Sequence, residues 1–435
     1  MVSDRSDDRT IDYKNALDRR AERSGESGDK SAPGRYLLPR LEIVVGGFAI
    51  LLLGAALAAD QAWFDRHFLP IFAIQHSVII TAEQGLRGFV ILTATMLLLI
   101  GRRPIARLLS RATAGGILRT ALAVALALGT AELILRLHPL HPHDADPLEL
   151  EPRRQPDPLL GWKFLPSRSV VAREAGRAVS YNFDAAGYRV PAPGAKLDVA
   201  QPTLIFTGES IITGFGLAWE ETIPARVSAL LGIQSANLAV SDYSNDQSYL
   251  RLAAELPRFH QPVAAVTLFM PSLLDRNLLT NRPRLGPGLV WQPPQQQWRL
   301  AALLHWLVPY RSKATIDDGI VRTRDSLAAL VHLACVRGAQ PLIVVPQFGE
   351  ASPVEEDLQR RNLDQAGLPY VSVRLDPAWH LPGDAHPDAR AARAIAAAVV
   401  ARLRPNDAAS ASKTQGKDNC GVFGSIKENW NPTRR

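Results

Sequence analysis

Residues 204–216 read LIFTGESIITGFG, an apolar run that turns polar at Gly208-Glu209-Ser210 and then continues with small and apolar residues. A continuous apolar run of this kind is typical of a strand that is buried on both faces of a sheet. The small residues around Ser210 would let another molecule approach its hydroxyl group closely. Gly and Ser are also common where any strand ends, so an ordinary turn is the alternative. A phosphate-binding loop is less favoured, because no Gly-Lys-Ser/Thr follows.

Short apolar runs alternate with segments of helical pattern from Pro202 onward. The sequence predicts strands at residues 203–206, 235–240, 263–270, 341–347 and 370–375. It predicts helices at residues 220–232, 245–259, 316–339, 354–367 and 388–403. Because alternating strands and helices indicate a parallel sheet covered by helices, we predict an α/β domain over residues 202–404. The active site of such a sheet lies at the carboxyl ends of its strands, where Ser210 follows the first strand.

Three apolar stretches precede this domain, at residues 43–59, 85–101 and 116–137, and each is a candidate for a membrane-spanning helix. Arg87, Arg119 and Glu132 fall within the last two stretches, and arginines near helix ends can reach the membrane interface. A buried or surface-lying helix is the alternative, mainly for the second stretch. We therefore predict a membrane region with three transmembrane helices over residues 37–138.

Basic residues flank these stretches unevenly. Arg35 and Arg40 precede the first stretch, the next loop carries only Arg66, and four arginines between residues 102 and 111 follow the second stretch. Cytoplasmic loops carry the excess of Lys and Arg, so the N-terminus and the second loop are predicted to be cytoplasmic. We expect a multi-pass protein of the bacterial inner membrane whose C-terminal domain is periplasmic or extracellular.

Composition excludes some classes of function and indicates which segments lie outside the folded domain. The net charge is +7, but the basic residues form no stripe with interleaved aromatics, which argues against nucleic-acid binding. The two cysteines, Cys335 and Cys420, are too few for a disulfide framework or a zinc cluster, and we expect both to be free. Residues 1–36 and 405–435 are polar and are predicted to be disordered tails. Residues 139–201, rich in Pro and acidic residues at their start, are interpreted as a linker and entry segment.

A serine nucleophile needs a base, and the base needs an orienting acid. The stretch GDAHPDARAARAIA, residues 383–396, offers Asp384 and His386 in the loop before the last predicted helix. The other histidines of the predicted domain are His260, His305, His332 and His380. Only His386 lies in a loop after the last strand with an acid two residues away, so it is predicted at the same sheet edge as Ser210. A helix cap for Asp384 and an exposed loop for His386 are the alternatives.

These residues carry a resemblance to the SGNH, or GDSL, hydrolase family in a membrane-tethered bacterial form. TGESIITGFGLAWEETIPARVSALLG (207–232) resembles the first block of the family, and GDAHPDARAARAIA resembles its last. NLAVSDYSNDQSYLRL (237–252) resembles the second block, LFMPSLLDRN (268–277) falls where the third is expected, and YNFDAAGYRV (181–190) resembles a segment before the first. The resemblance spans residues 130–403, and it implies a flavodoxin-like three-layer α/β fold behind three transmembrane helices.

The resemblance implies that Ser210 is the nucleophile, His386 the general base and Asp384 the group that orients His386. It also implies an oxyanion hole made by the nucleophile's backbone N–H, a Gly N–H of the second block and an Asn side chain of the third. The corresponding residues of this chain are Ser210, Asp242 and Ser272.

Three residues depart from the family pattern. Glu209 replaces the Asp of Gly-Asp-Ser, Asp242 replaces the Gly, and Ser272 replaces the Asn. The carboxylate of Asp242 would repel a developing oxyanion unless it turns away, and the Ser272 hydroxyl has a shorter reach than an Asn amide. Loss of one oxyanion donor costs about 10²- to 10³-fold in rate.

The resemblance implies a serine esterase without metal or cofactor that removes O-acyl groups from envelope or secreted carbohydrate. Two alternatives stay open: an O-acyltransferase that needs a membrane partner as acyl donor, and an inactive SGNH-like binding module, which the three departures favour. Residues 278–310 form an insertion over the predicted site. Its tryptophans, Trp291, Trp298 and Trp306, either stack on sugar rings or belong to a lid helix that packs on the domain or touches lipid.

Overall fold

The computed structural model describes residues 34–72, 74, 76–137, 153–271 and 274–404. The chain splits into two compact units, Met1–Ala58 with Gly85–Leu122, and Ala59–Gln84 with Ala123–Arg435. The segment between the first two long helices therefore belongs to the same unit as the C-terminal domain. The predicted tails and residues 139–152 lie outside the described residues, apart from the last three residues of the N-terminal one.

Three helical stretches in the described part are long and apolar enough to cross a membrane, as the sequence predicts. They are Leu37–Ala58, His76–Ser110 and Ala114–Leu137, with mean hydropathies of 2.3, 1.6 and 1.7. The helices that form them are α2 (Gly34–Ala58), α4 (His76–Met96), the π-helical turn η1 (Leu97–Gly101), α5 (Arg102–Ser110) and α6 (Ala114–Leu137). Helices that are apolar all round, as α2 and α6 are, suit a lipid environment.

The second unit is built on an eight-stranded sheet with the order β12-β11-β8-β6-β7-β5-β4-β3. Its parallel strands are β6 (Pro202–Phe206), β7 (Gln234–Asn237), β8 (Gln261–Leu268), β11 (Gln340–Phe348) and β12 (Tyr370–Leu375). These correspond to the five predicted strands, and the α/β class is confirmed. Numbered along the chain, they lie in the order 2-1-3-4-5 of a flavodoxin-like sheet.

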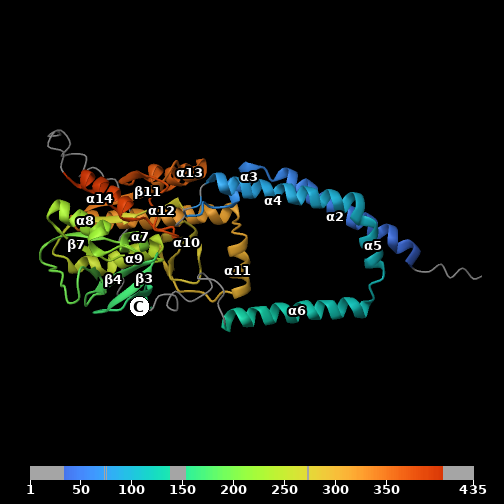
Figure 1. Cartoon of the computed structure of the whole chain (residues 1–435), viewed down its shortest axis with the longest axis horizontal. Coiled ribbons are helices and arrows are strands. Elements are labelled where there is room, and N and C mark those ends of the chain that lie inside the picture. Colours follow the sequence, from blue (N-terminus) through green and yellow to red (C-terminus); the bar gives the residue numbers. More distant parts are fainter. Residues whose placement is uncertain (1–33, 73, 75, 138–152, 272–273, 405–435) are drawn as a thin grey trace, which may run out of the picture. The chain divides into compact units, whose positions relative to one another are not determined.

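Helices cover both faces of this sheet (Figure 1). The covering helices are α8 (Ile223–Leu231) and α14 (Ala389–Leu403) on one face, and α9 (Asn245–Glu255) and α12 (Lys313–Val336) on the other, with α13 (Pro353–Asn362) against α12. Leu204 and Phe206 of β6 pack in the core under α8 and α14, whereas Ile205 packs in the core under α9. Since alternate residues of a strand point to opposite faces, a strand covered on both sides has to be apolar throughout.

The described part of the predicted linker and entry segment is folded into strands. They are β1 (Arg154–Asp157) paired with β2 (Gly161–Phe164), and β3 (Ser169–Glu174), β4 (Arg177–Phe183) and β5 (Arg189–Val190), which extend the main sheet antiparallel. The β3–β4 hairpin turns at Ala175 and Gly176, both with positive φ, as a type I′ turn requires. The linker interpretation therefore does not hold from Arg154 onward, because the Pro-rich start of the segment masked this pattern.

The insertion after β8 contains short elements. They are α10 (Leu274–Leu278), β9 (Arg284–Leu285), η5 (Pro287–Leu289), β10 (Trp291–Gln292) and α11 (Arg299–Leu307); the remaining short turns and helices of the unit are α3 (Gln61–His67), α7 (Ser210–Thr213), η2 (Trp219–Glu221), η3 (Leu256–Arg258) and η6 (Asp364–Ala366). The Glu132 carboxylate of α6 accepts hydrogen bonds from the N–H groups of Arg299 and Leu300, at 3.1 and 2.8 Å, and so caps the start of α11.

Cys335 on α12 is disulfide-bonded, so the prediction of a free thiol there was wrong. The amino-acid composition does not reveal whether two cysteines pair.

Candidate active site

Ser210 stands at the carboxyl end of the first parallel strand. After β6 the chain turns at Gly208, where φ is 150° and an added Cβ would lie 3.0 Å from Ile212. Glu209 then caps α7, because its side chain accepts the Ile211 N–H at 2.9 Å. β6 has β7 on one side and β8 on the other, so Ser210 starts its helix at the point where the strand order reverses.

The structure brings Ser210, His386 and Asp384 together. His386 Nε2 lies 2.8 Å from Ser210 Oγ, although 176 positions separate the two residues in the chain. His386 Nδ1 lies 2.6 Å from Asp384 Oδ1, and the His386 backbone N–H donates to the same oxygen at 2.8 Å. Ser210 is only 3% exposed, whereas the His386 side chain is 22% exposed. The three side chains form one hydrogen-bonded chain with the imidazole in the middle, and Ser210 is its most buried member.

The loop that carries His386 is fixed by its own backbone and by an aromatic ring. The Leu381 N–H donates to the His386 carbonyl at 2.9 Å, and the Asp384 N–H donates to the Leu381 carbonyl at 3.1 Å. Phe215 stacks on the imidazole with ring centres 4.2 Å apart. The hydrogen bond from His386 lowers the pKa of Asp384, and this outweighs partial burial, which raises it. Asp384 is therefore held as the carboxylate that orients the ring.

Glu209 contacts the Ser210 hydroxyl as well as capping the helix. The Ser210 Oγ–H has a second acceptor in Glu209 Oε2, besides His386 Nε2. Arg276 of α10 donates to the same Glu209 oxygen at 3.2 Å. Glu209 Oε2 thus bridges the guanidinium of Arg276 and the hydroxyl of Ser210.

Asp242 combines a left-handed backbone with a carboxylate that faces arginine side chains. Its φ is +66°, in the left-handed region that Gly adopts most readily. Its carboxylate lies 2.8 Å from Arg154 and 3.9 Å from Arg276, and its carbonyl accepts from Arg282 at 2.6 Å. Burial raises the pKa of Asp242, but Arg276 and Arg154 outweigh it and hold that pKa far below its ordinary value. The carboxylate is therefore ionised at neutral pH, and it is paired with arginines.

The predicted oxyanion donors have different outcomes. The hydrogen bonds of the described residues leave the backbone N–H groups of Ser210 and Asp242 without an acceptor. Ser272 lies outside the described residues, so its role stays a prediction. Within the described part of the chain, no three His, Cys, Asp or Glu side chains gather in a group that would hold a metal ion.

A buried arginine supports the segment that follows Ser210. Arg189 of β5 is 1% exposed and donates to the carbonyls of Thr213, Gly214 and Leu217, at 2.8, 2.6 and 2.6 Å. Its guanidinium lies 4.2 Å over the ring of Tyr181. Burial lowers the pKa of Arg189 to about 10, so it remains charged at neutral pH. This is the arginine of the segment YNFDAAGYRV.

A second network from the same strands reaches Gly216. The Gly216 N–H lies 2.9 Å from Glu174 Oε2 and 2.8 Å from Tyr181 Oη. Arg153 pairs with Glu174 at 2.8 Å. An added Cβ at Gly216, where φ is +68°, would lie 2.3 Å from Leu381 of the histidine loop. The entry strands therefore hold the segment on which the histidine loop rests.

Sequence reasoning missed several residues of this site. Arg276 and Arg189 lie in stretches that the resemblance had already marked, so a charged residue inside each block was the available signal. Phe215 lies in the first block, but nothing in the sequence indicates that it stacks on His386. Phe72, whose ring centre lies 6.3 Å from that of His386, comes from the segment between two membrane helices and gave no signal.

No family model and no curated protein matches this sequence. Among solved structures, a GDSL-like lipase from Bacteroides thetaiotaomicron is 15% identical, with 47% of this chain and 91% of that chain covered and a TM-score of 0.30. An acetyl xylan esterase from Butyrivibrio proteoclasticus is 11% identical, with 48% and 65% covered and a TM-score of 0.31. The chain is similar to GDSL hydrolases. Activity and substrate are therefore inferred from the side chains of this chain.

Proposed function

We propose that the protein is a membrane-anchored serine esterase of the SGNH type, which hydrolyses O-acyl esters of envelope or secreted carbohydrate outside the membrane. The observation that carries this proposal is the hydrogen-bonded chain from Ser210 through His386 to Asp384 at the carboxyl end of β6. Serine hydrolases of unrelated folds share this order of hydrogen-bonded side chains, in which the base lies between the nucleophile and the orienting acid.

In the first half-reaction, Ser210 Oγ attacks the acyl carbonyl carbon while His386 Nε2 takes the hydroxyl proton. The carbonyl electrons move onto its oxygen, and the N–H groups of Ser210 and Asp242, with Ser272, are the proposed donors to that oxyanion. The oxyanion then collapses, and the bond to the alcohol oxygen breaks. His386 Nε2 gives its proton to that oxygen, so the alcohol leaves neutral and the acyl group stays on Ser210.

In the second half-reaction, His386 Nε2 takes a proton from water, whose oxygen attacks the acyl carbon. Collapse of this second oxyanion breaks the bond to Ser210 Oγ, which recovers its proton from His386, and the carboxylic acid leaves. Asp384 stabilises the imidazolium in both halves, and its lowered pKa keeps it ionised for that task.

The arginines around Asp242 support an active site rather than an inactive one. Arg154 and Arg276 pair with the Asp242 carboxylate, so its charge is balanced next to the proposed oxyanion position. Arg276 also pairs with Glu209 at 3.2 Å, so the charge of the carboxylate that contacts the Ser210 hydroxyl is balanced as well. Unbalanced negative charge beside a developing oxyanion would disfavour the transition state, and this pairing removes it.

Contacts within the second unit support the proposed topology. The Arg311 N–H donates to the His67 carbonyl at 2.8 Å, and His67 Nδ1 lies 2.9 Å from the Arg311 carbonyl oxygen. His67 belongs to the segment that joins the first two membrane helices, so this segment lies on the same side of the membrane as the domain. The basic flanks favour the outer side for both of them, at the periplasmic face of an inner membrane. A domain tethered there has access to acylated envelope or secreted carbohydrate.

A fluorophosphonate probe on the full-length protein in detergent tests the proposal. We expect the native protein to be labelled and to release acetate from acetylated carbohydrate, and we expect Ser210→Ala to do neither. Native protein that is not labelled, or equal labelling of Ser210→Ala, would contradict an esterase and favour the binding module. Mass analysis with an acceptor sugar present separates hydrolysis from acyl transfer.

A further inference from the structure

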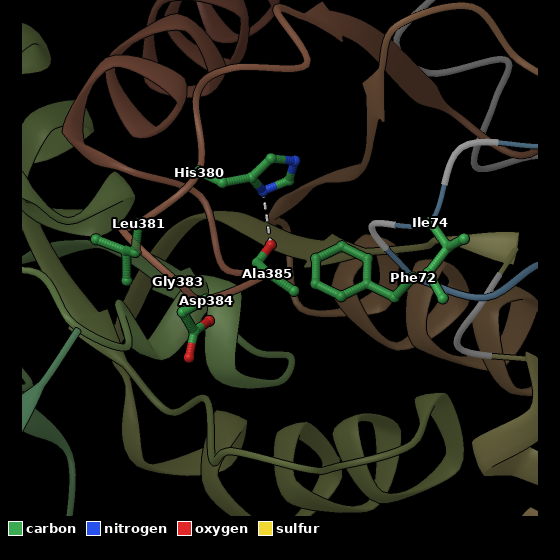
Figure 2. Close-up of a pocket in the computed structure, with 7 residues that line it drawn as sticks. All are labelled: Phe72, Ile74, His380, Leu381, Gly383, Asp384 and Ala385. Atoms are coloured by element: carbon green, nitrogen blue, oxygen red, sulfur yellow. Dashed lines mark hydrogen bonds between the residues drawn. The ribbon is translucent and has the colours of Figure 1, made fainter. Parts of the chain in front are cut away.

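A pocket of about 470 Å³ lies beside the triad, on the side of the loop that carries Asp384 and His386. Such a volume falls in the range of small-molecule sites. Five lining residues come from this loop and two from the segment between the first two membrane helices. They are His380, Leu381, Gly383, Asp384 and Ala385, with Phe72 and Ile74 (Figure 2). Figure 2 shows the ring of Phe72 beside Ala385, with Ile74 farther out on the same wall.

The segment that carries Phe72 is docked on the domain at several points. Phe68 forms an antiparallel bridge with Tyr310, and the ring of Trp63 stacks on Tyr310 at 6.1 Å between centres. Leu69 is buried in the cluster around Leu274 and Ile316. These contacts lie within one compact unit, so Phe72 follows directly from an anchored stretch of chain.

Phe72 itself lines the pocket and also contacts the triad. Its ring lies edge to face with His386, with 6.3 Å between centres and 67° between planes. It also lies edge to face with Phe348, at 6.5 Å and 70°. Phe215 stacks on the face of the same imidazole, with 4.2 Å between ring centres. Phe72 and Phe215 therefore contact the imidazole in different orientations.

Proton transfer decides which half of an ester this pocket receives. His386 gives its proton to the alcohol oxygen, so the alcohol half leaves on the His386 side. The acyl half stays with the proposed oxyanion donors at Ser210 and Asp242. The pocket is lined by the histidine loop, and Asp242 is not among its lining residues. Its position therefore matches the alcohol half.

We propose that this pocket binds the alcohol half of the ester, a carbohydrate ring whose apolar face rests on Phe72. Ile74 and Leu381 supply the remaining apolar wall. The membrane region is then part of the substrate site as well as the anchor. This inference rests on the proposed esterase function and names the part of the substrate that the loop recognises.

The test compares Phe72→Ala with the native full-length protein in detergent, on acetylated sugars and on acetate esters of a small alcohol such as ethanol. We expect kcat/KM for acetylated sugars to fall about two- to tenfold, the range for loss of one aromatic stacking contact. Ethyl acetate should change less than twofold. The rate of deacylation, which involves water and no alcohol, should be unchanged, and Phe72→Tyr should restore the sugar esters.

Two controls separate this proposal from its alternatives. Ile71→Ala removes a neighbouring exposed side chain that does not line the pocket and should behave like the native protein. The fluorophosphonate probe loses only fluoride, so its reaction with Ser210 should not depend on an alcohol site. Equal labelling of Phe72→Ala would show that the triad is intact.

Three outcomes would overturn the inference. Unchanged kinetics on sugar esters would remove any role for Phe72 in binding. A slower deacylation, or an altered preference among acyl chain lengths with one alcohol, would place the acyl half in the pocket. Lost probe labelling would show that Phe72 positions His386 instead. Each of these leaves the esterase proposal standing, whereas residual hydrolysis by Ser210→Ala in the same assays would remove that proposal itself.

Discussion

Arg189 offers the sharpest test of how the entry strands support the nucleophile. Its guanidinium donates to three backbone carbonyls in the segment after Ser210, and it does so from β5, a strand of the antiparallel edge. We predict that Arg189→Met, which keeps much of the side-chain volume, destabilises the domain and slows catalysis. Arg189→Lys keeps the charge but lacks the fork that serves several carbonyls at once, so it should fall between Met and the native residue.

The magnitude follows from the carbonyls that lose a donor. Gly214 O keeps the Leu217 N–H at 3.1 Å, and Thr213 O keeps a long contact with Asn237 at 3.5 Å. Leu217 O has Arg189 as its donor among the described residues. An unpaired buried carbonyl costs about 1–3 kcal/mol, and two weakened ones add less. Removal of a buried charge returns part of this, so we expect a net loss of about 2–3 kcal/mol.

Thermal unfolding and steady-state kinetics measure both effects. A loss of that size lowers the Tm of a domain this large by about 4–12 °C. The kcat should fall with little change in KM, because the turn that aims Ser210 loosens while the pocket stays intact. Arg177→Met is the matched control: Arg177 is an exposed residue of β4 whose ion pair with Glu221, at 2.9 Å, should contribute about 1 kcal/mol or less. A Tm within about 2 °C of native for Arg189→Met, with unchanged kcat, would refute the reasoning.

Three further predictions concern the charges of the site. Asp384→Asn should lower kcat by about 10³- to 10⁴-fold, because His386 loses its orienting acceptor. The pKa of Asp384 is lowered in the folded state, so the stabilisation by its carboxylate is present above the unfolded-state pKa of about 3.9 and is lost as the pH falls through the folded-state pKa. The Tm measured from pH 6 down to pH 3 should therefore fall more steeply for the native protein than for Asp384→Asn. Parallel curves for the two proteins would contradict this. Asp242→Gly relieves a positive φ and leaves Arg154 and Arg276 beside the oxyanion position, so kcat should equal or exceed the native value; a tenfold loss would show that the carboxylate is needed.

The central sheet was predictable because its signals are local. Four of the five parallel strands, all except β7, are short, mainly apolar runs, and the helices between them follow the 3.6-residue period. The position of Ser210 after the first strand and of His386 after the last one placed them at the same edge of the sheet. Chain order alone therefore predicted a common edge for the two residues, although not the contact between them.

The antiparallel edge was not predictable in the same way. The β3–β4 hairpin turns on Ala175-Gly176 instead of the Asn-Gly or Asp-Gly that marks such turns most strongly. Its strands follow a stretch rich in Pro and acidic residues, which pointed to a linker. The composition of the whole segment therefore favoured a linker, and the alternating pattern of its strands was overlooked.

The contacts around the site depend on residues that are remote in the chain. Arg154 and Arg276 approach Asp242 from segments on either side of it, and Phe72 reaches His386 across more than three hundred positions. No short sequence pattern predicts such long-range contacts. The sequence could show that Asp242 replaces a glycine, but only the structure shows the arginines that balance its charge.

The late position of His386 has a consequence for how the protein is made. Ser210 is synthesised 176 residues before the histidine that contacts it, and only α14 follows the histidine loop among the described residues. A chain that is still being synthesised would therefore carry a serine hydroxyl with no base beside it. If Ser210 acts as proposed, the growing polypeptide stays inert towards esters until almost all of the domain has been synthesised.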